Sequence, residues 1–327
     1  MGNPSEPVPQ VGSVTVIIPT RNRPGFLRAA VASVLEQTRP VNEIIVVDDG
    51  SDGAEWLRQI ESMSPIIEII RRKDCSGPAA ARNHGLARAH GEFLLFLDDD
   101  DLVDPRFVET GLAQLAAHPD ADGVFFRYRI IHSTEPWLPD EANASSASCL
   151  AATGNPTPRA MLEARPASAF MRYLLPIHSG FIRHSALGTV RFPEQLRQGE
   201  DTYFWIALAA AGSRLVLDEH PYAVVRRHAG NTTRSRIRYR VEIQPCYEKL
   251  LADHLLTDPE DRFLAHLKLL LFKLLTGKGG AAAHVERVIC SPRLLVHELR
   301  FWLGNLQMRL TASTSTWVAA RTSRPHL

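Results

Sequence analysis

Short apolar runs that alternate with helix-like segments are the feature that most constrains the fold of this chain. Val14–Ile18 is a β-branched run ended by Pro19, and apolar residues at helical spacing follow the next polar loop. The same order recurs, with strands expected at Ile44–Val47, Ile66–Ile70, Glu92–Leu97 and from Gly123, and helices at Pro78–Ala89 and Pro105–His118. This alternation predicts an α/β fold built on a doubly wound, mainly parallel sheet with helices on both faces.

Three of the expected strands run into polar residues, and strand ends are where such sheets bind ligands. They are Thr20 and Arg21 after the first strand, Asp48 and Asp49 after the second, and Asp98–Asp101 after the run Phe93–Leu97. Crowded carboxylates raise one another's pKa values or attract a cation. Mg²⁺ prefers oxygen ligands, commonly carboxylates together with substrate phosphates. The four aspartates therefore predict either a metal site for a phosphorylated ligand or a solvated turn that caps a helix.

Bulk composition narrows the class of protein. The chain has 327 residues, of which 45% are hydrophobic, so it can bury a substantial core as one large domain or two smaller ones. A net charge of +1 gives no general reason to expect nucleic acid as a partner. The widely spaced cysteines favour reduced thiols in a cytosolic protein over a zinc site or a disulfide framework; they are Cys75, Cys149, Cys246 and Cys290.

The pattern along the chain changes near both ends and once in the middle. Residues 1–12 are expected to be disordered, and neither a secretory signal nor a membrane-spanning stretch is expected. Residues 133–165, rich in Ala, Ser, Pro and Thr, predict a long loop or insertion, with ordered structure resuming near Ala169. Residues 236–327 predict a helical C-terminal extension with amphipathic segments at Phe263–Leu275 and Leu294–Leu310.

Common phosphate-binding signatures are missing. No GxGxxG follows the first strand and no GxxxxGK[ST] occurs, which argues against a dinucleotide site and a P-loop. Asp98 and Asp100 fit the DxDx[TV] pattern of haloacid dehalogenase-type phosphatases, but Leu102 stands at its fifth position. A phosphatase of this type stays open as an alternative.

Four segments resemble family 2 glycosyltransferases, in the order and spacing of that family. They are VTVIIPTRNRP from Val14, IIVVDDGSD from Ile44, GPAAARNHGLARAHGEFLLFLDDDDL from Gly77 and GEDTYFW from Gly199. The resemblance implies a GT-A catalytic domain at residues 13–235, with a nucleotide-sugar half over about 13–130 and an acceptor half over about 166–235. It also implies an inverting transfer from a nucleotide-sugar to an acceptor hydroxyl, assisted by Mg²⁺ or Mn²⁺, in polysaccharide or glycolipid assembly. A catalytically silent sugar-nucleotide-binding module is the other alternative.

The resemblance assigns donor contacts to the first two strand ends. Thr20 and Arg21 correspond to the loop that lines the base and ribose of the nucleotide. Asp49 corresponds to the carboxylate that accepts a hydrogen bond from the base, commonly uracil N3–H, which makes a UDP-sugar the expected donor. Asp48 would orient the loop. The alternative for Asp48 is a purely structural role in an Asx turn into Gly50.

Positions near the diphosphate follow from the third segment. Arg82 and Asn83 correspond to the part that packs near the ribose and diphosphate, and the forked donors of arginine suit phosphate. The alternative for Arg82 is a solvated helix face.

The resemblance places the metal at the four aspartates. Asp100 is expected to bind it, and Asp98 to contact the ribose or a metal-bound water, while Asp101 is structural. Asp99 stands where the family often has a small residue, so the ligating carboxylate stays open among Asp98, Asp99 and Asp100. His228 is a candidate for completing the metal shell.

The catalytic base is expected in the ED pair formed by Glu200 and Asp201. The resemblance assigns the role to Asp201, which takes the proton of the acceptor hydroxyl as it attacks the anomeric carbon. The alternative is that the pair only stabilises a helix N-terminus. Ile177–Gly180 resembles the strand entry that frames the acceptor pocket.

The C-terminal third leaves partners and location open. Six arginines lie between Arg226 and Arg240, where a solvated face, a pyrophosphate clamp or contact with anionic lipid are the alternatives. The apolar and basic segment Phe263–Leu275 predicts a helix that packs on the catalytic domain or lies at a membrane surface. The chain is expected to be cytoplasmic, with peripheral membrane contact through these helices. A saccharide or a lipid-linked acceptor would suit, and the donor sugar is not evident from the sequence.

Overall fold

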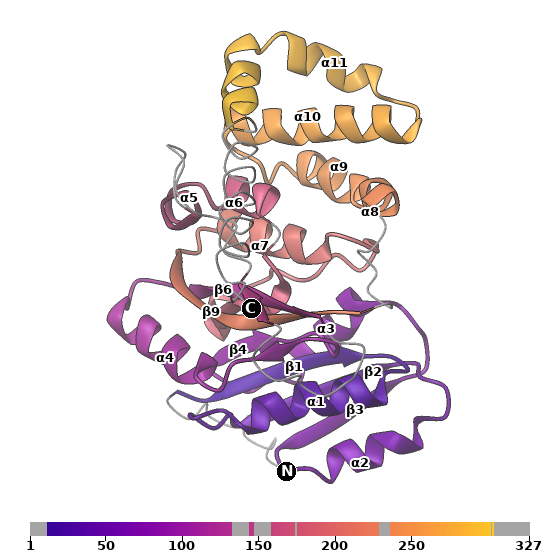
Figure 1. Cartoon of the computed structure of the whole chain (residues 1–327), viewed down its shortest axis with the longest axis vertical. Helices are drawn as coiled ribbons and strands as arrows, with labels where there is room; N and C mark the ends of the chain where they lie inside the picture. The colour runs from indigo at the N-terminus through magenta and orange to yellow at the C-terminus, as the bar shows by residue number, and fades with distance from the viewer. Residues whose placement is uncertain are drawn as a thin grey trace, which may run out of the picture.

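The described strands form one nine-stranded mixed sheet (Figure 1). The computed structural model describes residues 12–132, 144–146, 158–173, 175–228, 236–301 and 303. The strand order is β3-β2-β1-β4-β8-β6-β9-β5, with β7 paired to β6. The strands are β1 (Val14–Thr20), β2 (Glu43–Asp49), β3 (Ile67–Arg72), β4 (Phe93–Phe96), β5 (Leu102–Val103), β6 (Gly123–His132), β7 (Ala144–Ser146), β8 (Gly180–Arg183) and β9 (Leu215–Arg227).

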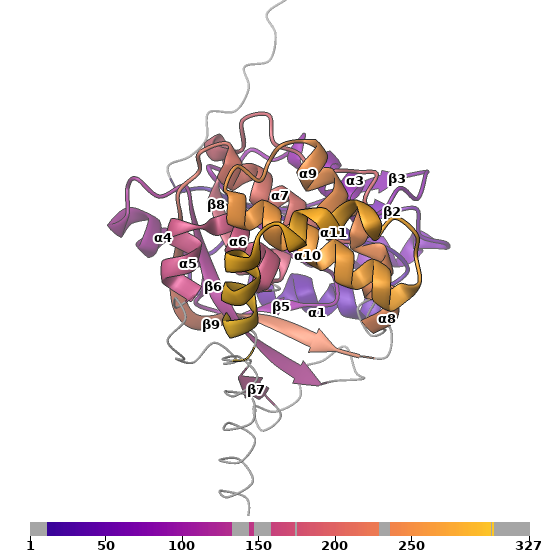
Figure 2. The ribbon, with the colours of Figure 1, turned by 90° about the horizontal axis from the view of Figure 1, so that it is seen from above.

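Helices cover the sheet and extend beyond it at one end. Figure 1 shows α8–α11 stacked over α6 and α7, with α1 and α2 at the opposite end, and Figure 2 views the molecule from the side of the C-terminal helices. The bounds are α1 (Pro24–Leu35), α2 (Leu57–Glu61), α3 (Pro78–Leu86), α4 (Phe107–Ala117), α5 (Pro158–Ala164), α6 (Pro166–Arg172), α7 (Glu200–Ala210), α8 (Arg236–Glu242), α9 (Gln244–Ala252), α10 (Pro259–Thr276) and α11 (Ala282–Ile289). Residues 292–301 are also helical.

The parallel half of the sheet sets the position of the strand ends. β2 pairs with β1 and β3, and β4 pairs with β1, all in parallel. The register places Thr20 opposite Asp48 and Ile17 opposite Phe96. The polar residues after β1, β2 and β4 therefore emerge at one edge, as the sequence predicts. The predicted α/β fold with a mainly parallel sheet and C-terminal helices is confirmed, and the antiparallel strands β5, β7 and β8 are added to it.

Side chains of β1 point alternately into two cores, which explains why its sequence is apolar without interruption. Ile17 joins a core with Phe204 of α7, whereas Val16 and Ile18 join a second core with Val31 of α1. All five side chains are fully buried. Full burial of a side chain of this size contributes about 1.5–3 kcal/mol, so both faces of the strand stabilise the sheet.

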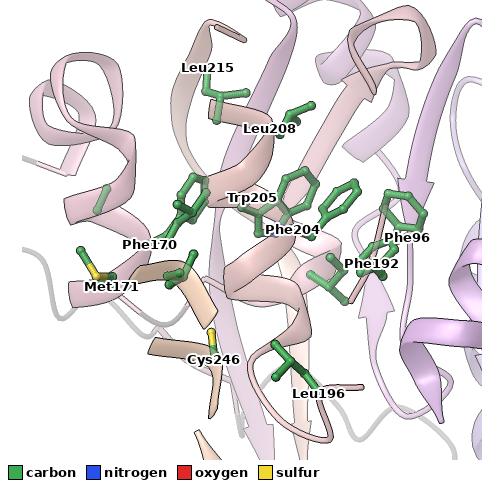
Figure 3. Close-up of a cluster of buried hydrophobic side chains, with 14 of the residues drawn as sticks. Phe96, Phe170, Met171, Phe192, Leu196, Phe204, Trp205, Leu208, Leu215 and Cys246 are labelled. Carbon is green, nitrogen blue, oxygen red and sulfur yellow. The ribbon is translucent and has the colours of Figure 1, made fainter. Parts of the chain in front are cut away.

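Aromatic packing fixes α7 against the sheet (Figure 3). Phe204 stacks on Phe192 with ring centroids 4.0 Å apart, and Phe96 meets both rings edge-on. Trp205 packs edge-to-face on Phe125 at 4.8 Å. Such pairs add about 0.5–1.5 kcal/mol each beyond their buried area. The helix that carries Glu200 and Asp201 is therefore held rigidly.

The described part of the insertion at 133–165 departs from the expected loop. Pro158–Ala164 is helical, because Met161 and Leu162 bury their side chains in the core with Trp205. Ordered structure thus resumes earlier than Ala169. Apart from β7, the remainder of the insertion lies outside the described residues. Of the N-terminal segment that was expected to be disordered, residues 1–12, only Gly12 is described. The long strand β9 was not predicted, because the polar residues 218–220 interrupt its apolar pattern.

The C-terminal helical extension packs on the rest of the chain through α10. Asp258 caps this helix by accepting the Glu260 N–H at 2.7 Å, and Gly277, with φ 66°, ends it. Leu264 and Leu269 are fully buried in the same core as α7. The first part of this helix therefore packs on the rest of the chain, which was one of the two alternatives predicted for Phe263–Leu275. In the described chain, no helix combines the length and the hydropathy that crossing a membrane requires.

Candidate active site

A cavity of about 820 Å³ opens where the three strand ends meet the N-terminus of α7. Most of the predicted site residues line it: Thr20, Arg21, Asp49, Arg82, Asp98, Asp100, Glu200 and Asp201. The opposite wall comes from the helical extension, with Tyr239, Arg240, Ile243 and Phe272. The fold therefore brings together side chains from both predicted halves and from the extension.

The aspartates after β4 form a tight turn in which the Asp101 N–H donates to the Asp98 carbonyl at 3.1 Å. Asp98, Asp100 and Asp101 each offer a carboxylate oxygen within 4.8 Å of the others. Nε2 of His228 lies 3.0 Å from Asp100 Oδ2. Burial and the charges of Asp100 and Asp98 raise the pKa of Asp101 well above its usual value. This crowding of oxygen donors fits a hard divalent cation such as Mg²⁺ or Mn²⁺.

Asp99 turns away from this cluster. It accepts a hydrogen bond from Thr20 Oγ1 at 2.7 Å and pairs with Arg23 Nη1 at 3.0 Å. The same nitrogen of Arg23 lies 2.8 Å from Asp100 Oδ2. Burial and the charge of Asp100 raise the pKa of Asp99 to about 7 in spite of these partners. Of the carboxylates that the sequence left open as ligands, Asp98 and Asp100 face the cluster and Asp99 braces the turn.

Arg226, the first of the six arginines, packs against this turn and is not part of a solvated face. Its Nε donates to the Asp100 carbonyl at 2.7 Å, and its backbone N–H donates to Asp101 Oδ1 at 2.8 Å. The side chain is fully buried, with the guanidinium 4.9 Å from the Phe26 ring. His178 is also fully buried, and burial lowers its pKa to about 4, so its imidazole is neutral at pH 7. Both side chains support the structural role predicted for Asp101.

Arg82 links the aspartate cluster to α7. Its Nη2 donates to Asp98 Oδ1 at 2.6 Å and its Nη1 to Glu200 Oε1 at 3.0 Å. Only 2% of Arg82 is exposed, so the alternative of a solvated helix face is wrong. Burial alone would lower the pKa of this arginine, but the charges of Asp98 and Glu200 outweigh it and raise the pKa. The guanidinium therefore stays charged and joins the expected metal side to the expected base side.

The ED pair begins α7 at the rim of the cavity. Gly199, with φ 82°, precedes it, and a Cβ there would lie 2.3 Å from Ile243 Cδ1, so the position requires glycine. Burial and the charge of Asp201 raise the pKa of Glu200 to about 7. Burial also raises the pKa of Asp201, whose Oδ1 accepts the Thr202 N–H at 2.6 Å. A carboxylate with a raised pKa is the better proton acceptor, which suits a general base.

The two aspartates that end β2 have distinct surroundings. Asp48 is fully buried and accepts the N–H of Ser51, three residues on, at 3.1 Å, so it fixes the loop through Ser51 and not through Gly50, where the Asx turn was expected. Asp49 pairs with Arg72 at 2.9 Å and accepts the backbone N–H of Gly77 at 2.7 Å. Asp49 thus fixes the loop before α3 and also borders the cavity. Its contact with a nucleotide base stays a prediction.

Asn83 is turned toward the protein rather than the cavity. Its Nδ2 donates to the Phe192 carbonyl at 2.9 Å, and its Oδ1 accepts the Phe192 N–H at 2.9 Å. This pair anchors the segment that supplies Phe192 to the aromatic packing under α7. Arg23 was not predicted as a partner of the aspartates, because nothing local in the sequence marks which carboxylates an arginine will pair with.

Comparison with known proteins places the chain in a family. Residues 15–187 match Glycosyl transferase family 2, which covers more than half of the chain. An uncharacterized glycosyltransferase of Rickettsia felis is 31% identical over 203 residues, covering 61% of this chain and 31% of the relative. The succinoglycan biosynthesis protein ExoU of Rhizobium meliloti is 29% identical, covering 72% of this chain and 67% of the relative. The chain thus spans about a third of the length of the first of these relatives.

Solved structures support the fold. A fragment of S. aureus TarS in complex with UDP-GlcNAc superposes with a TM-score of 0.58 at 18% identity, covering 85% of this chain and 79% of that one. The mannosyltransferase PcManGT from Pyrobaculum calidifontis, in complex with GDP-Man and Mn²⁺, gives a TM-score of 0.52 at 18% identity, covering 93% and 87%. The fold is of the GT-A type, which excludes the haloacid dehalogenase alternative. The chain belongs to glycosyl transferase family 2.

Proposed function

We propose that this chain is a glycosyltransferase that moves a sugar from a UDP-sugar to an acceptor hydroxyl, with inversion at the anomeric carbon and Asp201 as general base. One observation carries the proposal. The aspartate cluster after β4 and Asp201 line the same cavity, and Arg82 links Asp98 of the cluster to Glu200, the neighbour of Asp201. A donor held at the cluster would present its sugar toward the N-terminus of α7, where an acceptor hydroxyl can be deprotonated.

The donor side would be bound by the strand ends. Thr20 and Arg21 would line the nucleotide and Asp49 would accept a hydrogen bond from its base. TarS has been solved with UDP-GlcNAc and PcManGT with GDP-Man, so the fold accommodates both bases. The uracil N3–H donor suits a carboxylate acceptor, which favours a UDP-sugar here.

The metal would be held by Asp100, with Asp98 and His228 at its side. When bound, Mg²⁺ or Mn²⁺ supplies charge neutralisation on the leaving diphosphate. The 3.1 Å hydrogen bond from the Asp101 N–H to the Asp98 carbonyl stabilises the turn, and Arg226 Nε donates a second hydrogen bond to the Asp100 carbonyl. The chain's own residues thus present oxygen donors without rearranging the strand end.

Asp201 would take the proton of the acceptor hydroxyl as that oxygen attacks. Glu200 shares the helix N-terminus and is tied to Arg82, so it positions Asp201 without being needed as acceptor of the proton. General-base catalysis of this kind typically contributes about 10²–10⁴-fold.

We infer the acceptor class from the relatives and the location from the surface of the helical extension. ExoU takes part in succinoglycan biosynthesis, and we propose polysaccharide or glycolipid assembly for this chain as well. Leu274, Leu275 and Ile289 are each more than 60% exposed, and the cations Lys278 and Arg287 are exposed nearby in the chain. An apolar and basic surface of this kind suits peripheral contact with an anionic membrane that carries a lipid-linked acceptor.

The function is tested by incubating the full chain with a panel of nucleotide-sugars and Mn²⁺ and measuring nucleoside diphosphate release. UDP-sugars should be turned over, and chelation of the metal should stop the reaction. Asp100→Ala should weaken Mn²⁺-dependent donor binding by about 10–100-fold or more, measured by titration calorimetry. Asp120→Ala, at an exposed site, is the matched control. Binding of a nucleotide-sugar without any transfer would instead indicate a silent binding module, and an unchanged Mn²⁺ dependence would remove Asp100 as ligand.

Membrane contact is tested by co-sedimentation of the full chain with phosphatidylcholine vesicles, with and without phosphatidylglycerol. Binding should require the anionic lipid and fall with added salt. The double substitution Leu274→Ser and Leu275→Ser should release the protein from the vesicles without lowering its melting temperature. Equal recovery of both proteins with the vesicles would argue against this surface.

A further inference from the structure

Two arginines at the acceptor end of the cavity have no charged partner among the described residues. Arg197 and Arg240 both line the cavity, and no ion pair or hydrogen bond of their guanidinium groups occurs within the described part of the chain. Arg23 and Arg82, which line the same cavity, are each paired with carboxylates. A cation that the fold leaves unpaired beside carboxylates is available to a ligand.

Packing brings these two arginines to the same part of the rim. Gly199, two residues after Arg197, lies against Ile243, three residues after Arg240, and its carbonyl accepts a hydrogen bond from Cys246 Sγ at 3.2 Å. The loop before α7 is thus in direct contact with the start of α9, which directly follows α8. The charge of Asp201 also contributes to raising the pKa of Tyr239, after burial, so the end of α8 lies near the proposed base.

The surroundings favour a ligand that is partly apolar and negatively charged. Ile243 and Phe272 line the same wall, whereas Glu200 and Asp201 would repel an anion that lacked a cation beside it. The forked donors of arginine match the oxygens of phosphate and carboxylate groups.

We propose that Arg197 and Arg240 bind an oxyanion, a phosphate or a carboxylate, carried by the acceptor close to the hydroxyl that Asp201 deprotonates. This inference rests on the proposed function and names the acceptor class for it. The donor diphosphate would be bound elsewhere, at the aspartate cluster through the cation proposed there. The two arginines come instead from the acceptor half and the extension.

The test compares neutral and anionic acceptors of matched size, using the full chain, Mn²⁺ and the donor that it turns over. The soluble phosphate pair is N-acetylglucosamine and its anomeric phosphate, and the carboxylate pair is octyl glucoside and octyl glucuronide. Farnesyl-diphosphate-linked N-acetylglucosamine represents a lipid-linked phosphate. The anionic members should give a kcat/KM at least about tenfold higher, since a charge-assisted hydrogen bond contributes about 1.5–3 kcal/mol. Which anionic member is best identifies the source of the oxyanion.

Substitutions separate acceptor binding from donor binding. Arg197→Ala and Arg240→Ala should each lower kcat/KM for anionic acceptors about tenfold, leave neutral acceptors nearly unchanged, and leave the donor Kd within about twofold. Arg240→Lys should recover part of the loss because it keeps the charge. Arg238→Ala, on the same helix but outside the cavity lining, is the control and should change neither value.

Four results would overturn the inference. Equal kcat/KM for neutral and anionic acceptors would show that no oxyanion is recognised. A weakened donor Kd in both alanine variants would reassign the arginines to the diphosphate. If no nucleotide-sugar is bound or turned over at all, the proposed function fails and this inference fails with it, whereas Asp201-dependent turnover that prefers neutral acceptors overturns the inference alone.

Discussion

The two ends of the cavity differ in how their charges are satisfied. At the donor end, Asp98 pairs with Arg82, which also pairs with Glu200 at the start of α7 and is only 2% exposed. At the acceptor end, Arg197 is exposed and Arg240 half-buried, and neither has a charged partner within the described residues. The first arrangement is part of the folded structure, and the second is available for a ligand. Substitutions at the donor end should therefore cost stability, whereas those at the acceptor end should cost only activity.

The largest expected effect on stability is that of Arg82→Met. Removing one partner from a buried ionic network leaves Glu200 and Asp98 uncompensated, which typically costs about 3–5 kcal/mol. Urea denaturation of the purified variant measures this loss. Arg88→Met is the matched control, since the Arg88–Glu68 pair is exposed and should contribute less than about 1 kcal/mol. Similar losses in the two variants would remove the contrast between buried and exposed pairs.

A smaller effect on stability is expected from a change in pH, through the titration of Glu200. Its pKa is raised in the folded state from 4.5 to about 7, so between these values the folded chain binds more protons than the unfolded chain. Stability should therefore increase as the pH falls from about 7 toward 4.5, by an amount on the order of 1–3 kcal/mol from this group. Asp99, with a pKa also raised to about 7, adds in the same direction.

The variant Glu200→Gln isolates the contribution of that carboxyl group. Its free energy of unfolding should depend less on pH over this window, and its stability should approach or exceed that of the unmodified chain near pH 8. Denaturant titrations at several pH values measure both curves. Parallel curves would mean that Glu200 keeps an ordinary pKa in the folded protein.

The smallest expected change in stability is that of Arg240→Ala. A side chain without a partner among the described residues should contribute less than about 0.5 kcal/mol to folding. The melting temperature by circular dichroism should stay close to that of the unmodified chain. A loss as large as that of Arg82→Met would show that Arg240 belongs to the folded network and would erase the difference between the two ends.

Much of the fold could be predicted because it depends on local pattern. The apolar run Val14–Ile18 ends in polar residues, and parallel pairing then brings Thr20 beside Asp48 with no further information needed. β9 was not predicted, since the polar residues 218–220 interrupt its apolar pattern, and helix Pro158–Ala164 was not predicted because its burial depends on a core formed by distant residues.

The residues that belong to the candidate site could be predicted from the sequence, but not which of them pair with one another. The residues after the strands do meet, as the topology requires, but Arg82 and Glu200 are 118 positions apart, and no local pattern marks them as partners. The same holds for Arg226, which supports an aspartate turn 126 positions before it. Which charged side chains pair across a fold depends on which of them are removed from water by packing. Only the three-dimensional arrangement determines that.

The central claim, that Asp201 is the general base opposite a donor held at the strand ends, is tested most directly by Asp201→Asn. The measurement combines acceptor-dependent nucleoside diphosphate release with donor affinity by calorimetry on the same protein. We expect kcat to fall by about 10²–10⁴-fold, because the amide cannot take the proton, while the donor Kd stays nearly unchanged. Transfer at the rate of the unmodified chain, or a loss of donor binding that accounts for the whole effect, would contradict the assignment.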